Sequence, residues 1–329
     1  MQLHSLAPRS PQAIGYSLPK SFGALLVISF SGCAPAGTAT LPQPTTAQTP
    51  AASVTPPIGA RGLILPPNGG RRFLYCARPL TLWLKVDSTA APYAQMIAGT
   101  GEIRGDEGIG RHRGHEVIYI RSGWGFAMLG SDTARLGPGS TMYVPPGTRH
   151  RLVSSGSEPL SYFWVIGPGA SSEGFARAAS IGCPGGPATS PPSAAVAADS
   201  SNATVVVNPG EGERIVYCDI PLVITAKIDS ERVAGTWFRA ATGALRRGQE
   251  AGVHQVDEVA LFTHGRGRAF VGSDTVAVEA GSFVYTPRGM QHGFINESSE
   301  TLEYVVVYAG SSARAALKRR AARPGPWCP

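Results

Sequence analysis

The chain carries one pattern of histidine, glutamate, proline and glycine twice, at a constant offset of 142 residues. The positions related by this offset include His112 and His254, Glu116 and Glu258, and His150 and His292. No residue has been inserted or deleted between the first and the last of them. A fixed period of this kind marks a tandem duplication, so the chain must build one fold twice.

The length of the chain agrees with this division. Its 329 residues fall in the range of about two domains, and each repeat is long enough to bury a core of its own. The division we expect is a first domain over 63–168, a linker over 169–204 with Cys183, a second domain over 205–310, and a C-terminal helix or tail over 311–329 with Cys328.

The composition of the repeats favours strands. The chain has 41 glycines and 28 prolines, and short β-type runs alternate with turn signals along both repeats. Gly130-Ser-Asp-Thr133 and its counterpart Gly272-Ser-Asp-Thr275 are typical of hairpin connections, because glycine tolerates positive φ and aspartate caps the turn. These features predict an all-β fold of sandwiches or small barrels. The strand-like runs of the first repeat are 117–120, 125–129, 140–144 and 160–166.

The first 32 residues predict an export signal. Arg9 and Lys20 supply positive charge around an apolar stretch at 22–30 that is too short to span a bilayer as a mature helix. The run Phe30-Ser31-Gly32-Cys33 resembles the lipobox of bacterial lipoproteins, and this resemblance implies a lipid on Cys33. We therefore expect an extracytoplasmic protein held at a bacterial membrane by its lipid anchor, in the periplasm or on the cell surface. A plain secreted protein is the alternative.

Residues 33–62 have the composition of a tether. Pro, Thr and Ala dominate this segment, which therefore cannot bury a core of its own. A disordered segment of this kind would hold a globular part away from a membrane surface.

The net charge of +7 comes largely from scattered arginines and from the basic run at 318–320. This distribution indicates solvated surface charge. Because aromatic and basic residues are not interleaved, we expect no nucleic-acid partner.

The cysteines that follow Cys33 predict disulfides, since an exported protein meets an oxidising compartment. Four cysteines allow three pairings. The duplication favours pairing within each repeat, Cys76 with Cys183 and Cys218 with Cys328, because the ancestral unit had to make its own bridge. Neither pair has the close spacing of a zinc site, so we expect no metal bound by sulfur.

The repeated histidines and glutamates predict a metal site in each repeat. His112 and Glu116 lie an even number of residues apart, so on a continuous strand they would face the same side. A turn rich in proline and glycine leads to His150, which would come from a distant strand. Two imidazoles and one carboxylate suit a divalent transition metal, with open positions for water, oxygen or substrate. The candidate ions are Fe, Mn, Ni, Zn and Cu, and the equivalent ligands of the second repeat are His254, Glu258 and His292.

The spacing of these residues resembles the two motifs of the cupins. The first copy has His112-x3-Glu116-x6-Gly123 and Gly139-x5-Pro145-x-Gly147-x2-His150, and the second copy has the same pattern from His254 to His292. The resemblance implies a bicupin, with two jelly-roll-like β-barrels in one chain. It also implies a small-molecule substrate and an enzyme of the dioxygenase type, similar to quercetin dioxygenase. Glu116 and Glu258 would serve as metal ligand or as general base.

Two other functions stay open. A cupin isomerase or lyase would use the same site without oxygen. A non-catalytic lipoprotein that binds a small molecule or a metal would need no turnover at all, and a barrel that has lost its metal would keep His and Glu as a buried hydrogen-bonded cluster.

One position departs from the cupin pattern. Metal-binding cupins commonly begin the first motif with His-x-His, but Gly110 and Gly252 occupy the leading position here. Each site therefore has three ligands of the family type instead of four. Glu107 and Glu250 lie just upstream, where they are more simply interpreted as solvated loop carboxylates than as a further oxygen ligand.

Other polar residues give weaker indications. Arg104 and Arg246 are equivalent and either clamp an anionic substrate or form ion pairs at the barrel edge. His115 is expected on the surface. Tyr143, Tyr285, Tyr162 and Tyr304 are expected to pack in the core or at the rim. The first site should be the more positive and the better candidate for an anionic substrate, because its neighbours include Arg111, Arg113, Arg149 and Arg151.

Overall fold

The computed structural model describes residues 55–129, 132–185, 204–310, 321 and 324–327. The predicted signal at 1–32, Cys33, most of the predicted tether and Cys328 lie outside these residues. Within the described part of the chain, no helix combines the length and the hydropathy needed to cross a membrane.

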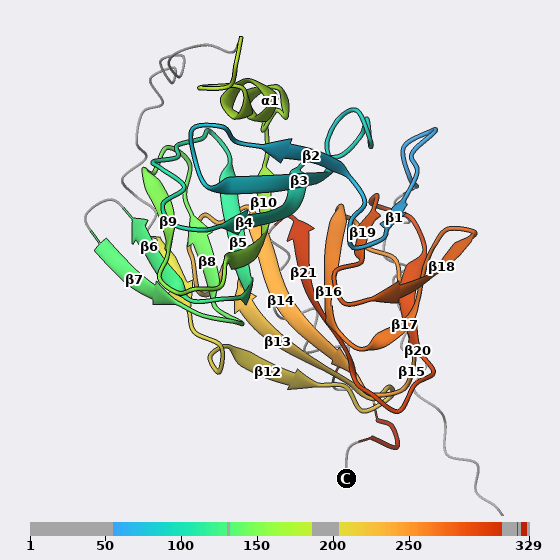
Figure 1. Cartoon of the computed structure of the whole chain (residues 1–329). Helices are drawn as coiled ribbons and strands as arrows, with labels where there is room; N and C mark the ends of the chain where they lie inside the picture. Colours follow the sequence, from blue (N-terminus) through green and yellow to red (C-terminus); the bar gives the residue numbers. More distant parts are fainter. Residues whose placement is uncertain (1–54, 130–131, 186–203, 311–320, 322–323, 328–329) are drawn as a thin grey trace, which may run out of the picture. The chain divides into compact units, whose positions relative to one another are not determined.

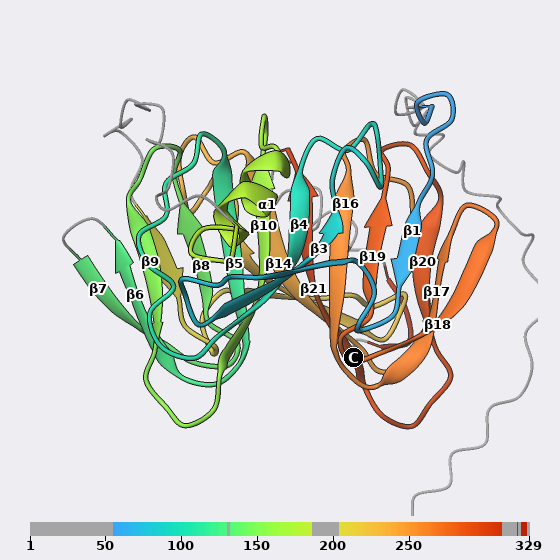
Figure 2. The ribbon, with the colours of Figure 1, turned by 45° about the horizontal axis from the view of Figure 1, so that its top comes forward.

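The first repeat forms a barrel of two antiparallel sheets (Figures 1 and 2). Its strands are β2 (Arg71–Leu74), β3 (Leu80–Val86), β4 (Ile97–Ile103), β5 (His115–Ser122), β6 (Gly125–Leu129), β7 (Asp132–Leu136), β8 (Thr141–Val144), β9 (His150–Ser154), β10 (Leu160–Gly167) and β11 (Val205–Val207). The large sheet has the order β11-β8-β5-β10-β4-β3-β2, and the small sheet has the order β7-β6-β9. The strand-like runs predicted for the first repeat fall on these strands, except that Ser140 lies just before β8.

The second repeat gives the same arrangement with one additional strand, β15, in its small sheet. Its large sheet has the order β1-β19-β16-β21-β14-β13-β12, and its small sheet has the order β15-β20-β17-β18. These strands are β1 (Leu63–Leu65), β12 (Glu213–Val216), β13 (Leu222–Ile228), β14 (Phe238–Leu245), β15 (Gly248–Gly252), β16 (Glu258–His264), β17 (Arg266–Val271), β18 (Asp274–Glu279), β19 (Phe283–Thr286), β20 (His292–Asn296) and β21 (Leu302–Ala309).

The central strands of the large sheets are almost wholly apolar because both of their faces are covered. All eight residues of β10 are buried between β4 and β5. Strand β21 has the same place between β14 and β16, and only Glu303 in it is exposed. Aromatic and β-branched side chains suit such pleated, buried surfaces, and both strands are rich in them. The fold is thus all-β, as the sequence predicts.

The two barrels exchange their first strands. Strand β1 pairs with β19, with Leu63 opposite Tyr285, and β11 pairs with β8, with Val205 opposite Tyr143. Residues 63 and 205 are related by the repeat offset, so the exchange is reciprocal. In Figure 1 the blue strand β1 lies beside β19 among the orange and red strands. The domains expected at 63–168 and 205–310 therefore each give three residues to the other barrel. The exchange pairs backbone groups that an open sheet edge would leave exposed.

Buried lysines anchor the chain just after each exchanged strand. Lys85 Nζ donates hydrogen bonds to the carbonyls of Pro67 and Gly69, both at 2.6 Å. In the second repeat, Lys227 Nζ donates to the carbonyl of Pro209 at 2.8 Å. Burial lowers the pKa of Lys85 to about 8, with a further lowering by Arg121. The repeated lysine thus has a structural role, because it fixes the segment that leads away from the exchanged strand.

The boundary between the barrels is a packed core that contains a buried polar cluster. The rings of Phe163 and Phe283 meet edge to face at 6.2 Å. Asp257 is fully buried and accepts hydrogen bonds from the backbone N–H groups of Gln95, in the first barrel, at 3.0 Å and Arg288 at 2.9 Å. A buried carboxylate bonded to both halves fixes their contact, because its donors would otherwise lose their partner.

His115 occupies the position equivalent to Asp257, and the expectation that it lies on the surface is wrong. Its ring is half-buried, and Nδ1 lies 2.5 Å from the hydroxyl of Tyr143. Burial lowers the pKa of His115, and the charge of His112 lowers it further. Tyr143 and Tyr285 are buried in the core, as expected.

One of the two predicted disulfides is present, between Cys76 and Cys183, with the Cα atoms 5.2 Å apart. The bridge ties the segment after helix α1 (Glu173–Ala179) to the entrance of the first barrel. This helix lies within the range expected to be a linker, and it packs beside β2 (Figure 1). The pairing of Cys218 with Cys328 stays a prediction. The N–H of Trp327, the residue before Cys328 in the sequence, donates to the carbonyl of Cys218 at 3.1 Å.

Candidate metal centres

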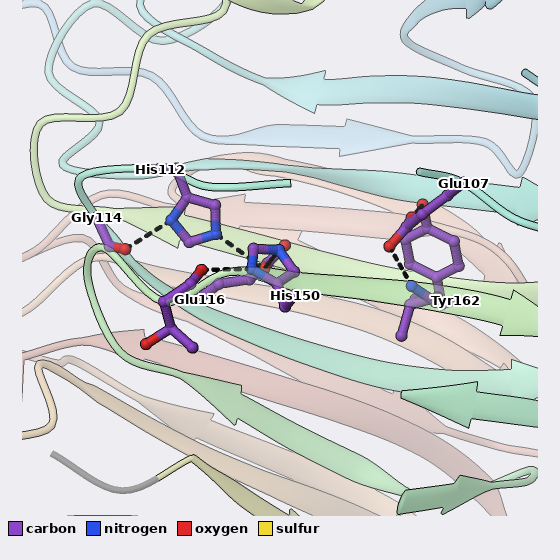
Figure 3. Close-up of polar contacts among 8 residues, drawn as sticks. Glu107, His112, Gly114, Glu116, His150 and Tyr162 are labelled. Carbon is purple, nitrogen blue, oxygen red and sulfur yellow. Dashed lines mark hydrogen bonds and ion pairs between the residues drawn. The ribbon is translucent and has the colours of Figure 1, made fainter. Parts of the chain in front are cut away.

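Two histidines and a glutamate converge in the first barrel, and we call this group site 1 (Figure 3). Glu116 is the second residue of β5, His150 is the first residue of β9, and His112 lies in the loop before β5. His112 and Glu116 are thus not on one continuous strand, contrary to expectation. The chain instead turns at Gly114, and the carbonyl of Gly114 lies 2.7 Å from Nδ1 of His112.

The two imidazoles of site 1 face a single carboxylate oxygen. Nε2 of His112 lies 2.9 Å from Oε2 of Glu116, and Nε2 of His150 lies 3.1 Å from the same atom. Nδ1 of His150 lies 3.0 Å from the carbonyl of Thr148. Because a carbonyl only accepts hydrogen bonds, each Nδ1 carries a proton, and each Nε2 turns toward the glutamate. Neutral imidazoles would then present lone pairs to a carboxylate, so a cation is needed between them.

In the metal-free protein, protons supply this positive charge. Burial by itself raises the pKa of Glu116, but the charges of His112 and His150 lower it to about 2. Burial lowers the pKa of His150, whereas the charge of Glu116 raises it, to about 9. The cluster therefore keeps a carboxylate and a protonated imidazole together near neutral pH. A divalent ion would displace the imidazole proton, as metal binding to histidine requires.

The second barrel repeats the group as site 2. Nε2 of His254 and Nε2 of His292 lie 3.1 and 3.3 Å from Oε2 of Glu258. This buried oxygen has no well-formed hydrogen bond within the described part of the chain. In each site one atom from each of the three residues falls within 4.8 Å of the others. Ligands about 2.1 Å from one ion have comparable separations, so both donor sets fit a divalent metal.

Comparison with known proteins agrees with the fold and the motifs. The cupin domain model matches residues 101–166 and 241–308. A search of curated protein sequences gives no match. The chain folds as a bicupin.

Solved structures with the same fold have little sequence in common with this bicupin. An oxalate decarboxylase of Bacillus subtilis has a TM-score of 0.58 and 17% identity, with 80% of each chain covered. The E. coli protein Ylba has a TM-score of 0.58 and 14% identity over 80% of this chain and 96% of its own. AerE from Microcystis aeruginosa has a TM-score of 0.54 and 12% identity over 72% of this chain and 95% of its own. The oxalate decarboxylase contains Mn(II) centres. At such identities the likeness establishes the fold alone.

Gly110, at the position where metal-binding cupins commonly have a histidine, lies beside site 1. A Cβ placed on Gly110 would lie 3.2 Å from Nε2 of His150, so a side chain here would enter site 1. The carbonyl and N–H of Gly110 both bond to the backbone of His150. The three-residue donor set is thus a property of this bicupin and not an error of alignment.

Glu107 and Glu250 are not solvated loop carboxylates, contrary to our expectation. Glu107 accepts a hydrogen bond from the N–H of Leu152 at 2.6 Å and another from the hydroxyl of Tyr162 at 3.3 Å (Figure 3). In the second barrel, Glu250 accepts a hydrogen bond from the hydroxyl of Tyr304. Neither glutamate belongs to a triad. Burial raises the pKa of Glu107 to about 7, with opposing effects of His150, which lowers it, and Glu116, which raises it.

A one-residue shift hides the equivalence of these two glutamates in the sequence. The N–H of Glu107 donates to the carbonyl of Leu152, while Glu250 pairs with Phe294. Leu152 and Phe294 are related by the constant offset of the repeats, but Glu107 and Glu250 lie 143 residues apart. Aligning the repeats by these upstream glutamates, and not by a rigid offset, would have found the pair.

A large cavity adjoins site 1. Its volume is about 460 Å³, within the range of small-molecule sites (roughly 300–1,000 Å³). His112, Glu116 and His150 line it together with Glu107 and Tyr162. Helix α1 covers one side through Gly174, Phe175 and Ala178.

Site 2 has almost no free space. The hollow beside its triad measures about 10 Å³, room for about one water molecule. One cross-strand pair beside the triads differs between the two sites. Ile97 lies opposite Ile166 at site 1, whereas the equivalent positions hold Arg239 opposite Tyr308. The guanidinium of Arg239 lies 3.9 Å from the ring centroid of Tyr308, whose ring also meets that of His254 at 5.0 Å.

Only some of the arginines expected at the sites line a cavity. Arg104 and Arg246 are exposed, and neither lines the cavity at its site, so the structure does not support the predicted clamp on a substrate. Arg111 and Arg113 do line the cavity of site 1. Arg151 instead pairs with Asp106 at 3.0 Å, and Arg149 is exposed. Arg78, which the sequence did not single out, also lines the cavity.

Proposed function

We propose that this bicupin is an extracytoplasmic metalloenzyme of the dioxygenase type that acts on a small organic substrate at site 1. The observation that carries the proposal is the convergence of two Nε2 atoms on one carboxylate oxygen beside a cavity of about 460 Å³. Two imidazoles and one carboxylate, with open positions, are the donor set typical of non-haem Fe(II) oxygenases. The replacement of the family histidine by Gly110 produces this set.

His112, Glu116 and His150 would hold the metal. A redox-active divalent ion bound by them would supply Lewis acidity and the electrons needed for dioxygen chemistry. The carbonyls of Gly114 and Thr148 orient the imidazoles, as described above.

A separate group in the cavity can hold a proton for the reaction. Glu107 lines the cavity but lies outside the triad, and burial raises its pKa to about 7. A carboxyl group with this pKa exchanges protons readily near neutral pH. The hydrogen bond from the Tyr162 hydroxyl and that from the Leu152 N–H fix the orientation of the group.

The proposed location rests on the disulfide and on the N-terminal sequence. A bridge between Cys76 and Cys183 suits an oxidising compartment. Labelling of cells with a radioactive fatty acid tests the lipid anchor. We expect label on the wild-type protein and none on Cys33→Ser, and an unlabelled wild type would leave plain secretion as the route of export.

The function is tested by metal analysis and by oxygen uptake. We expect two equivalents of metal per chain in the wild type, and one equivalent in both His112→Ala/His150→Ala and His254→Ala/His292→Ala. Oxygen uptake with a panel of flavonols, catechols and keto acids should be lost in the first variant and largely kept in the second. His264→Ala changes an exposed histidine and serves as the matched control. Metal without oxygen uptake would refute the dioxygenase proposal, and product analysis would then separate an isomerase or lyase from a binding protein.

A further inference from the structure

The wall of the site 1 cavity is largely apolar. Trp164 and Phe175 stack with ring centroids 5.0 Å apart and an interplanar angle of 20°. Both rings line the cavity, and they bring strand β10 and helix α1 together at its wall. The aliphatic residues of the lining include Leu80, Leu82, Ile97 and Ile118. Binding of a ligand against this wall is favourable when an apolar part of the ligand covers it and removes apolar surface from water.

Two partly buried arginines stand in the same lining. Arg78 Nη1 donates to the carbonyl of Glu107 at 2.8 Å, and Arg111 Nε donates to the carbonyl of Gly147 at 2.9 Å. Each bond fixes one nitrogen of the guanidinium and leaves other N–H donors. Neither arginine forms an ion pair with an acid within the described residues. Positioned guanidinium groups of this kind bind carboxylates well.

The second barrel lacks the arginines and the open space. Ile220 and Val253 occupy the positions equivalent to Arg78 and Arg111, and Arg239 with Tyr308 fills the space that Ile97 and Ile166 leave open. The arginines and the cavity thus occur together in one repeat and are absent together from the other. If packing common to both barrels required the arginines and the cavity, both repeats would have kept them.

We infer that site 1 takes an organic anion with an apolar body, namely an aromatic or branched aliphatic carboxylic acid, whose carboxylate meets Arg78 and Arg111. This inference rests on the proposed function, because it names the substrate class of the same site. A short dicarboxylate such as oxalate fits poorly. It would leave most of a cavity of about 460 Å³ and its apolar wall in contact with water.

Calorimetric titration of the metal-loaded, full-length protein tests the inference. The probes are trans-cinnamate, its neutral analogue cinnamyl alcohol, and oxalate. We expect cinnamate to bind with one equivalent per chain and at least tenfold more tightly than the alcohol, and oxalate to bind more weakly than both. Equal affinity for cinnamate and the alcohol, or preferred binding of oxalate, would overturn the inference.

Variants assign the effect to the named residues. Arg78→Ala/Arg111→Ala should lose the tenfold preference for the anion while it keeps binding of the alcohol, which also shows that the variant is folded. Arg104→Ala removes an exposed arginine away from the cavity and should leave the preference unchanged. Ile97→Arg/Ile166→Tyr copies the closed pair of site 2 and should abolish binding of both aromatic probes. A preference that survives in the double arginine variant contradicts the inference.

Metal content measured on the same samples separates this inference from the proposed function. Two equivalents of metal with no binding of cinnamate would reject the substrate class and leave the metalloenzyme in place. Binding of cinnamate with the expected preference by a protein that takes up no metal would reject the metalloenzyme and retain the anion site.

Discussion

Removal of the disulfide between Cys76 and Cys183 should destabilise the first barrel strongly. The bridge closes a loop of 107 residues, which includes nearly the whole barrel. In the chain-entropy model, a loop of that length lowers the entropy of the unfolded chain enough to contribute about 4.8 kcal/mol at 25 °C. For a barrel of about 100 residues the corresponding fall in Tm is roughly 20 °C or more. These values are upper limits, since residual structure in the unfolded chain reduces the entropy that the bridge removes.

Scanning calorimetry of Cys76→Ser/Cys183→Ser measures this effect. Addition of a reductant to the wild type should bring its first transition close to that of the variant. The variant itself should respond to reductant only through its remaining cysteines. Because the bridge follows α1, the helix that covers the site 1 cavity, the variant should also bind aromatic probes more weakly at temperatures where it is folded. A loss below about 1 kcal/mol would show that the barrel is held by its sheets and core alone, and would refute the reasoning from loop closure.

Three further predictions concern charge and packing. The pKa values of His150 and His292 are raised to about 9, so their contribution to metal-free stability is complete below about pH 6.5 and is lost as the pH rises through 9. The increase in Tm on adding metal should therefore grow between pH 6.5 and 9, and a constant increase in thermal scans would contradict this. Asp257→Ala leaves buried donors unpaired at the boundary between the barrels and should cost about 1–3 kcal/mol per orphaned group in urea unfolding; a neutral effect would argue against that role. Arg239→Ile/Tyr308→Ile should open site 2 without creating a binding site for aromatic acids. Addition of Ile220→Arg and Val253→Arg to this variant should give a second equivalent of bound aromatic acid in calorimetric titration. Binding by Arg239→Ile/Tyr308→Ile alone would show that apolar space suffices.

The sequence predicts the two barrels and the triads well, because both depend on local spacing. The constant offset reports the duplication, and the motifs place His150 and Glu116 at the starts of β9 and β5. His112 reached the predicted place by a turn and not along a strand. The pattern constrains the positions of the ligand side chains, but it does not fix the path of the backbone between them.

Other features depend on contacts that the spacing does not report. A three-residue apolar strand can complete the sheet edge of either barrel, so the exchange of β1 and β11 is decided by tertiary packing. The role of Glu107 was hidden by the one-residue shift between the repeats. Burial of His115 involves a partner hydroxyl, that of Tyr143, which the spacing does not report. Arg104 was singled out only by its recurrence. Recurrence identifies a shared position, but it does not show which way the side chain points.

The reciprocal exchange of β1 and β11 gives the pair of repeats the symmetry of a dimer of single-barrel subunits that swap their N-terminal arms. Each repeat makes the same contact with its neighbour, as the subunits of an isologous dimer do. A fragment that contains one repeat alone would retain an arm without an acceptor and an acceptor without an arm. Such a fragment should therefore associate with itself. In the full chain, the covalent link between the halves replaces this concentration-dependent assembly by a fixed pairing. One repeat is then free to change its pocket while the other keeps the architecture intact.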